Sequence, residues 1–236
     1  MKEFYENWAT AESTKPYRKN ILKWKAVNLA NLFLRTIKEE RIFSICEVGG
    51  ADGIVLSTVG DILGVKDLVN YELSSEFCRI GKEKYPNIQF INSEFQVDKK
   101  VIYDLILLSD IIEHVEDESN FLERVSQSCR YALFKIPIEE CLSDKEWVYK
   151  IRRRTKPEYL YYGPRHYNGH LRGYNLKKAL RCLSRYFDIL DLAVSDVLYF
   201  YGSPRQRLIK RWFGSRVAIW LWGGALFSLG VTNRHV

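Results

Sequence analysis

The fold of this chain is decided by residues 45–53, which read Ile-Cys-Glu-Val-Gly-Gly-Ala-Asp-Gly. An apolar run ends at an acid, Glu47, and leads into a glycine-rich turn and a second apolar segment. This order predicts a buried strand followed by a turn that lets the backbone approach a nucleoside cofactor, with a helix N-terminus facing it. A plain, tight connection between a strand and a helix has the same pattern, so other segments must decide.

The spacing of the glycines excludes a dinucleotide-binding loop. Such a loop requires Gly-x-Gly-x-x-Gly, but counted from Gly49 the third residue is Ala51 and the sixth is Ile54. The remaining pattern, Glu47-x-Gly49-x-x-x-Gly53, resembles the E/D-x-G-x-G-x-G motif of class I S-adenosylmethionine (SAM) methyltransferases. Ala51 replaces the middle glycine of that motif, which is tolerable if this residue needs no positive φ.

Three further segments follow in the order that this family shows. Residues 69–74 (Val-Asn-Tyr-Glu-Leu-Ser) predict a second buried strand that ends at Glu72, where an acid can bind both hydroxyls of a ribose. Residues 103–115 resemble the family's fourth strand and following loop, D-x-I-x-x-x-D-V-L-E-H-V. Residues 131–137 resemble its fifth strand with a terminal proline.

The resemblance and the alternating segments imply an α/β fold, a Rossmann-like seven-stranded, mostly parallel sheet with helices on both faces and an antiparallel last strand. A single domain of 236 residues is long enough to bury about 70% of its unfolded surface. We expect strands near 42–48, 67–72, 88–91, 103–109, 131–136, 187–194 and 225–233, and helices near 53–63, 75–85 and 118–129.

The single domain, residues 1–236, divides into four parts. Apolar positions at helical spacing over residues 17–38 predict a helix that lies on the sheet or over its carboxyl edge. In similar methyltransferases this region forms a lid on the cofactor, although an aromatic-rich arm can also serve only for packing. The parts are an N-terminal helical lid (1–40), a SAM-binding core (41–137), a basic substrate cap (138–173), and C-terminal helices and strands that complete the sheet (174–236).

Composition indicates an ordinary globular protein of a reducing compartment. The five cysteines are scattered, and no Cys-x-x-Cys pair occurs, so neither disulfides nor a zinc knuckle are expected. Lys2, Glu3 and Glu6 interrupt the apolar run that a cleavable signal requires. We therefore expect a cytoplasmic protein.

The predicted cap is strongly basic. Ten basic residues but one acid, Glu158, lie between Ile151 and Phe187, whereas the net charge of the whole chain is +7. Tyrosines alternate with these cations, so the segment suits an anionic acceptor such as a phosphate or carboxylate. A solvated basic face is the alternative, and single-stranded nucleic acid is a third that no recognised binding motif supports.

The resemblance implies SAM as cofactor and S-adenosylhomocysteine as product, bound at the carboxyl ends of the strands. It assigns cofactor contacts to Glu47, Gly49, Gly50, Gly53, Glu72, Leu73, Ser93, Glu94, Ser109 and Asp110. For the acceptor, the basic and aromatic residues Tyr17, Arg154, Arg165 and Arg172 are the candidates.

Methyl transfer asks for a nucleophile held in line with an activated methyl group and a base that removes its proton. Histidine suits this role near neutral pH. His114 follows the fourth strand, and His170 begins a segment similar to the G-H-x-R-x-F/Y turn of many small-molecule methyltransferases. We expect His114, His170 and Asp110 beside the transferred methyl; alternatively, the histidines only bond their own loop or cap a helix.

The same residues allow a metal. Asp110-x-x-Glu113-His114, with His170 downstream, is similar to the E-x-x-E-H plus histidine pattern of small-RNA 2′-O-methyltransferases and ubiquinone-pathway O-methyltransferases. That resemblance implies a divalent ion that polarises the acceptor hydroxyl. Asp110 replaces the glutamate, and metal-free relatives also carry Glu-His. We therefore favour the metal-free version and leave the metal ligands unknown.

Residues 205–222 alternate basic and large apolar side chains. Such a helix can lie in a membrane interface, or it can pack on the core and form a homodimer contact, which we weigh more heavily. The uncharged run from Val217 to Gly230 is too short to span a bilayer. Peripheral membrane contact would fit a lipid-linked acceptor.

Together these features predict a SAM-dependent methyltransferase that acts on a hydroxyl or amine of a small, anionic or lipid-linked metabolite, such as a sugar, isoprenoid or natural-product intermediate. A non-catalytic SAM-binding module on the same fold is the alternative, since fold does not determine function. The intact acids and glycines of the cofactor motifs argue against it. An RNA methyltransferase is a further alternative, and nucleic acid is the less favoured substrate.

Overall fold

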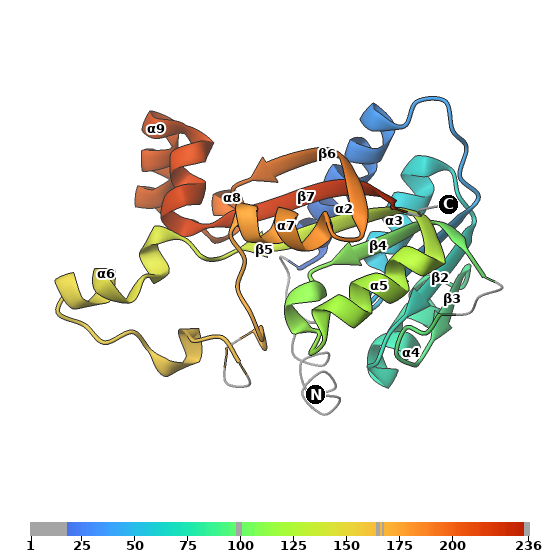
Figure 1. The fold of residues 1–236 in the computed structure, drawn as a ribbon, viewed down its shortest axis with the longest axis horizontal. Helices are drawn as coiled ribbons and strands as arrows, with labels where there is room; N and C mark the ends of the chain where they lie inside the picture. Colours follow the sequence, from blue (N-terminus) through green and yellow to red (C-terminus); the bar gives the residue numbers. More distant parts are fainter. Residues whose placement is uncertain (1–17, 98–100, 164–165, 167, 234–236) are drawn as a thin grey trace.

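The computed structural model describes residues 18–97, 101–163, 166 and 168–233. Its centre is a seven-stranded sheet of order β3-β2-β1-β4-β5-β7-β6 (Figure 1). β7 is antiparallel to both neighbours, and the pairs from β3 through β5 are parallel. The strands are β1 (Ser44–Val48), β2 (Asp67–Tyr71), β3 (Ile88–Ile91), β4 (Tyr103–Ser109), β5 (Cys129–Ile138), β6 (Phe187–Ser195) and β7 (Gly224–Thr232).

Helices cover both faces of this sheet (Figure 1). They are α2 (Arg18–Thr36), α3 (Ile54–Leu63), α4 (Ser75–Lys84), α5 (Glu118–Ser128), α6 (Glu146–Ile151), α7 (Leu176–Leu183), α8 (Leu198–Tyr201) and α9 (Pro204–Trp222), with the short 3-10 turns η1 (Ile112–His114), η2 (Leu142–Asp144) and η3 (Glu158–Leu160). Side chains of a strand alternate between the faces. In β1, Ile45 therefore packs with α2 and α3, and Cys46 packs with α5 and α7.

The α/β fold with an antiparallel last strand is confirmed, and every expected strand is present. β5 is longer than its apolar pattern predicts because it pairs with β4 from Cys129 and with β7 as far as Ile138. The helix expected over residues 17–38 is α2, which packs on α3 and on the end of the sheet formed by β5, β6 and β7. Residues 1–17 of the predicted lid lie outside the described residues.

Helix starts follow the local sequence. Ser74, Asp117 and Asn175 each accept a hydrogen bond from a backbone N–H in the first turn of α4, α5 and α7. Ser203 and Gln206 bond reciprocally at the start of α9, where Pro204 takes the first helical position. These caps place the loops at the carboxyl edge of the sheet.

α9 departs from expectation. Its only buried residue is Ala218, so the prediction that residues 205–222 pack on the core is wrong for most of the helix. Gly214 has φ +81° and interrupts the helix with a kink, which needs a residue without a Cβ. No helix in the described part of the chain is both long and apolar enough to cross a membrane.

The glycine-rich turn after β1 uses left-handed backbone at three residues. Gly49 has φ +70°, Gly53 has φ +78°, and Ala51 between them has φ +48°. The condition under which alanine would be harmless, a negative φ, is therefore not met. A non-glycine residue in this region costs about 1 kcal/mol or more.

We expect Ala51→Gly to raise the free energy of unfolding by up to about 1 kcal/mol, because relief of the left-handed strain exceeds the added freedom of the unfolded chain. Ala51→Val should lower it by more than about 1 kcal/mol, since a branched Cβ fits this backbone worse. Chemical denaturation of the three proteins measures both changes. Equal stability of the valine and alanine proteins would contradict a left-handed residue 51.

Candidate active site

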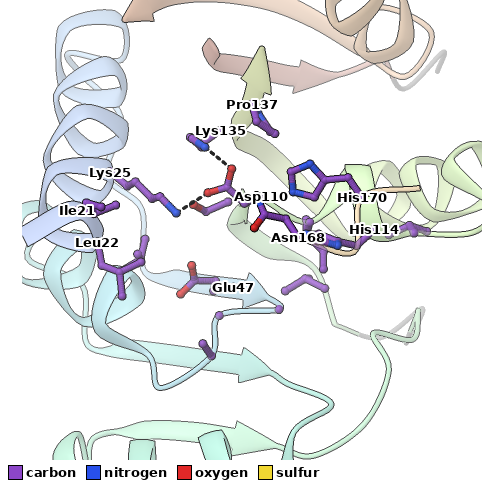
Figure 2. A pocket seen from close by; sticks show the side chains of 18 of the residues that line it. Ile21, Leu22, Lys25, Glu47, Asp110, His114, Lys135, Pro137, Asn168 and His170 are labelled. Carbon is purple, nitrogen blue, oxygen red and sulfur yellow. Dashed lines mark hydrogen bonds and ion pairs between the residues drawn. The ribbon is translucent and has the colours of Figure 1, made fainter. Parts of the chain in front are cut away.

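A large cavity of about 1190 Å³ opens at the carboxyl ends of β1, β2, β4 and β5 (Figure 2). α2 and the segment after η3 also line it. The sequence-predicted residues that line it are Glu47, Gly49, Gly50, Glu72, Leu73, Ser93, Glu94, Ser109, Asp110, His114 and His170. Gly53, Arg154 and Arg172 do not line it, and Tyr17 and Arg165 lie outside the described residues.

Glu72 joins the glycine-rich turn to the end of β2. One carboxylate oxygen accepts a hydrogen bond from the N–H of Ala51 at 2.8 Å, and the other accepts one from the N–H of Ser74 at 2.7 Å. Asn70 supports the same turn through Gly50 N–H, at 3.2 Å. The acid is thereby fixed at the cavity wall.

Glu47 is held at the start of α3 beneath the turn. Its carboxylate accepts a hydrogen bond from the N–H of Leu56 at 3.0 Å and is 1% exposed. Burial raises the pKa of Glu47 to about 8, and this single hydrogen bond offsets the effect only in part. Glu47 is therefore mostly protonated at neutral pH in the absence of ligand.

Asp110 lies where β4 ends, with a left-handed φ of +56°. Its carboxylate bonds both Lys135 of β5 and Lys25 of α2 (Figure 2). Burial alone would raise the pKa of Asp110, but the two lysines outweigh it and hold that pKa well below its usual value. The residue predicted beside the methyl group is thus a permanent anion between two cations.

Neither lysine was anticipated from the sequence. Lys135 is the only charged residue within the apolar run 131–138, and a lone cation in a buried strand requires an acid nearby. That signal could have identified Lys135, although not its partner. Lys25 carries no comparable signal, because it lies among other basic residues of α2.

His114 and His170 meet at the edge of the cavity, with ring centroids 4.8 Å apart. His170 Nδ1 lies 2.7 Å from a carboxylate oxygen of Glu139, and His114 Nδ1 lies 3.2 Å from the carbonyl oxygen of Gly169. Both oxygens only accept, so in the neutral form of each ring Nδ1 carries the proton and Nε2 has the lone pair. Burial and the His170 ring lower the pKa of His114 to about 4.

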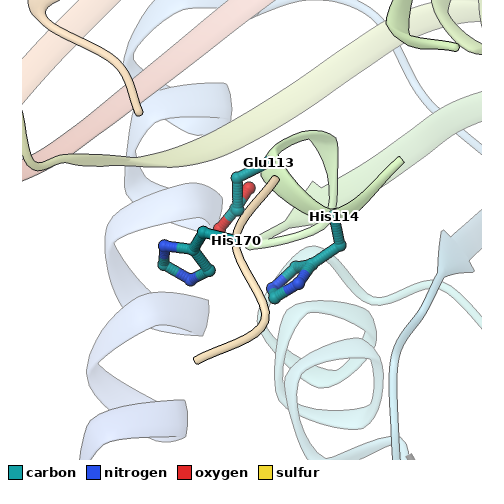
Figure 3. Close-up of side chains that lie close together, drawn as sticks. All are labelled: Glu113, His114 and His170. Carbon is teal, nitrogen blue, oxygen red and sulfur yellow. The ribbon is translucent and has the colours of Figure 1, made fainter. Parts of the chain in front are cut away.

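Glu113 points into the same cluster (Figure 3). It is fully buried, and neither carboxylate oxygen has a hydrogen-bond partner among the described residues. Burial, with the charge of Asp110, raises the pKa of Glu113 well above its usual value. Among the described residues, two groups bring potential metal ligands within 4.8 Å of one another: Glu113, His114 and His170, and Glu139, His166 and His170.

These donors are of a kind that divalent transition metals accept. Asp110 belongs to neither group and is instead bonded to its two lysines. The pattern expected from the sequence therefore does not assemble as four ligands.

The hydrogen-bond partners of Arg172 are backbone carbonyls of a neighbouring loop. Its guanidinium donates to the carbonyl oxygens of Ile112 at 2.9 Å and Glu116 at 2.8 Å, which holds the loop around η1. Arg154 is exposed to solvent. Instead, the cap residues that line the cavity are Ile138, Glu139, Ser143, Leu160, Tyr162, His166, Asn168 and His170.

The fold is that of a class I SAM-dependent methyltransferase. A family model described as a methyltransferase domain matches residues 17–186, and the chain belongs to this family, whose cofactor is SAM. Among curated proteins no match is found.

Solved structures share the fold at low sequence identity. The N-methyltransferase NodS from Bradyrhizobium japonicum WM9, in complex with S-adenosylhomocysteine, is 11% identical with a TM-score of 0.61, covering 97% of this chain and 98% of that chain. The putative methyltransferase of Haloferax volcanii, in complex with the activator Trm112, is 13% identical with a TM-score of 0.64, covering 96% of each chain. A putative sarcosine dimethylglycine methyltransferase from Galdieria sulphuraria is 13% identical with a TM-score of 0.61, covering 88% and 84%.

The raised pKa of Glu47 predicts a pH-dependent stability. The unfolded chain releases this proton near pH 4.5, whereas the folded chain keeps it until about pH 8. The free energy of unfolding should therefore fall between these two values, by up to about 4 kcal/mol from this group. Glu47→Gln cannot titrate and should lose less stability over the same range.

Denaturation of the ligand-free wild-type and Glu47→Gln proteins at pH 5 and pH 8 measures the difference. Glu83→Gln is the matched control, because Glu83 is an exposed glutamate on α4 and should follow the wild type. Parallel pH curves for the wild type and Glu47→Gln would contradict the protonated state of Glu47.

Proposed function

We propose that this protein transfers the methyl group of SAM to a hydroxyl or amine of a small-molecule acceptor, with His170 as the base and Glu139 as the residue that orients it. The observation that carries the proposal is the 2.7 Å bond between Glu139 and His170 Nδ1 at the edge of the cavity that the cofactor turn lines. A carboxylate on one ring nitrogen leaves the other as the basic one and stabilises the imidazolium.

The backbone of the glycine-rich turn supports SAM binding in this cavity, as do its acidic side chains. A Cβ added to Gly49 would lie 2.7 Å from the Ile111 side chain, and one added to Gly50 would lie 2.6 Å from Glu47 Oε2. Only glycine keeps this turn close to the wall of the cavity. We assign Glu72 to the ribose hydroxyls, and the turn at Gly49 and Gly50 to the rest of the cofactor.

SAM supplies a methyl group already activated by the sulfonium, so the protein has to position the acceptor and accept a proton. His170 Nε2 takes the proton from an acceptor hydroxyl as its oxygen attacks, or from an ammonium before the resulting neutral amine attacks. In both cases the methyl–sulfur bond breaks and S-adenosylhomocysteine leaves. His114 is less suited to this role, because a pKa of about 4 makes it a weak base at neutral pH. His114 instead contributes a neutral ring beside the acceptor.

The acceptor enters from the side of the cap. Tyr162, Asn168 and His170 form this part of the cavity wall. We keep the assignment of an anionic acceptor to the basic cap, with Arg154 at its exposed surface. Arg172 contributes through the η1 loop that carries His114.

Replacement of the ribose-binding acid tests the cofactor assignment. Glu72→Ala should weaken SAM binding by about 1.5 to 3 kcal/mol, more than tenfold, because charge-assisted hydrogen bonds are lost. Calorimetry with SAM and S-adenosylhomocysteine measures the affinity. Glu83→Ala removes an exposed acid of α4 and should bind as the wild type does. Unchanged affinity in a folded Glu72→Ala protein would refute the assignment.

The base is tested with an acceptor identified by screening extracts with methyl-labelled SAM. His170→Ala should lower kcat about 100-fold or more while SAM affinity is retained. Glu139→Gln should lower kcat less and shift the pH profile, since the imidazolium loses its anionic partner. Full activity of His170→Ala in single-turnover experiments would exclude a base at this position.

A chelator separates this mechanism from a metal-dependent one. We expect activity to survive chelation. Loss of activity that a divalent ion restores would instead assign Glu113, His114 and His170 to a metal. Salt-sensitive binding and methylation of RNA would indicate the nucleic-acid alternative.

A further inference from the structure

We infer that one end of the molecule is a docking surface for an anionic lipid bilayer. This surface, called here the basic aromatic end, comprises residues 142–156, which include η2 and α6, and residues 198–222, which include α8 and α9. Figure 1 shows α6 and α9 at the same end, remote from β2 and β3. η2 contacts both α6 and α9, so the two segments form one continuous surface.

The charge of this end is larger than that of the whole protein. Residues 142–156 contain six basic and two acidic residues, and residues 198–222 contain five basic residues and no acid. Their net charge is therefore +9, against +7 for the chain, so the rest of the protein is slightly acidic. A field of one sign confined to one end directs binding to an anionic partner.

Most of these cations are available to an external partner. Lys210 bonds Asp196 at 3.0 Å, and Lys150 pairs with Glu146 at 3.1 Å. Among the described residues, Arg205, Arg211 and Arg216 make no ion pair, and all three are exposed. Cations near an anionic membrane surface each add to its attraction.

Large apolar side chains are exposed on the same end. Trp212 is 77% exposed, Ile151 is 72% exposed and Trp220 is 63% exposed. Single exposed apolar residues are normal, but a gathering of them marks an interaction site. The set on this end is Trp147, Ile151, Tyr199, Tyr201, Leu208, Trp212, Phe213 and Trp220.

The mixture of side chains favours a bilayer over a protein or an RNA. Tryptophan and tyrosine rings prefer the interface between headgroups and acyl chains, and arginines beside them meet anionic headgroups. A protein interface would bury a compact apolar core, whereas the aromatic residues here alternate with arginines along α9. α9 is not long and apolar enough to cross a bilayer, and in the proposed arrangement it lies along the surface.

The active-site cavity reaches this surface. Its wall includes Phe200 and Tyr201 of α8, and Gln206 and Trp222 of α9, besides His170. If the proposed methyl transfer holds, an amphiphilic acceptor passes from the bilayer into the cavity along these aromatic residues. The docking surface itself does not depend on that reaction.

Vesicle co-sedimentation tests the inference without SAM or acceptor, so its failure is distinct from failure of the proposed function. The full chain should bind vesicles of phosphatidylcholine with an anionic lipid at least tenfold more tightly than vesicles of phosphatidylcholine alone. Salt should weaken this binding, and tryptophan fluorescence should shift to the blue on binding. Equal or absent binding to both vesicles at low salt would overturn the inference.

Variants locate the surface. Charge reversal of Arg205, Arg211 and Arg216 to Glu should reduce binding to anionic vesicles about a hundredfold, and Trp212→Ser with Trp220→Ser should reduce it about tenfold. Phe43→Ser, at an exposed aromatic residue outside this surface, is the matched control and should bind as the wild type does. An unchanged SAM affinity shows that each variant is folded.

Two other outcomes overturn the proposal. The first is a concentration-dependent dimer that Trp212→Ser abolishes in the absence of any vesicle binding. The second is binding of a single-stranded RNA oligomer that is tighter than binding to anionic vesicles and is lost in the tryptophan variants.

Discussion

The bond of Asp110 to two lysines is the constraint on which the site depends. Lys135 would otherwise place a cation within a buried strand, and Lys25 would bring another from α2. A buried charge without a partner costs several kcal/mol, so these three side chains stabilise one another or none of them is tolerated. The N–H of Asp110 also donates to the carbonyl of Lys135 at 2.9 Å. Asp110 thereby connects the end of β4 to β5 and α2 at the wall of the cavity.

The sheet could be predicted from the sequence because each strand has its own local pattern. Apolar runs that end in an acid or a glycine mark the carboxyl ends of β1 and β2, and parallel pairing collects those ends on one edge. The side of the cavity to which we assign the cofactor follows from local patterns of this kind. Glu47, Glu72 and Asp110 accordingly lie on its wall.

The other half of the site depends on contacts between distant segments, which no local pattern specifies. Glu139 bonds a histidine 31 residues away, and Lys25 bonds an acid on another element. As a basic residue of the cap, Arg172 was predicted to bind the acceptor, but its guanidinium donates to loop carbonyls instead. The positive φ of Ala51 was not predicted for a related reason, since the segments around a turn determine its backbone angles. The apolar content of α9 predicted burial, but among the described residues its contacts with η2 and α8 leave Ala218 as the one buried side chain of the helix.

The position of β7 has a consequence for how the protein is made. β7 pairs with β5 along one side and with β6 along the other, although it follows both of them in the sequence. β6 therefore has no place in the sheet during synthesis until residues 224–232 have left the ribosome. Until then one edge of β5 is unpaired, and other nascent chains can pair with it. Completion of the sheet thus has to await residues 224–232, and the edge of β5 stays open to association until they are made.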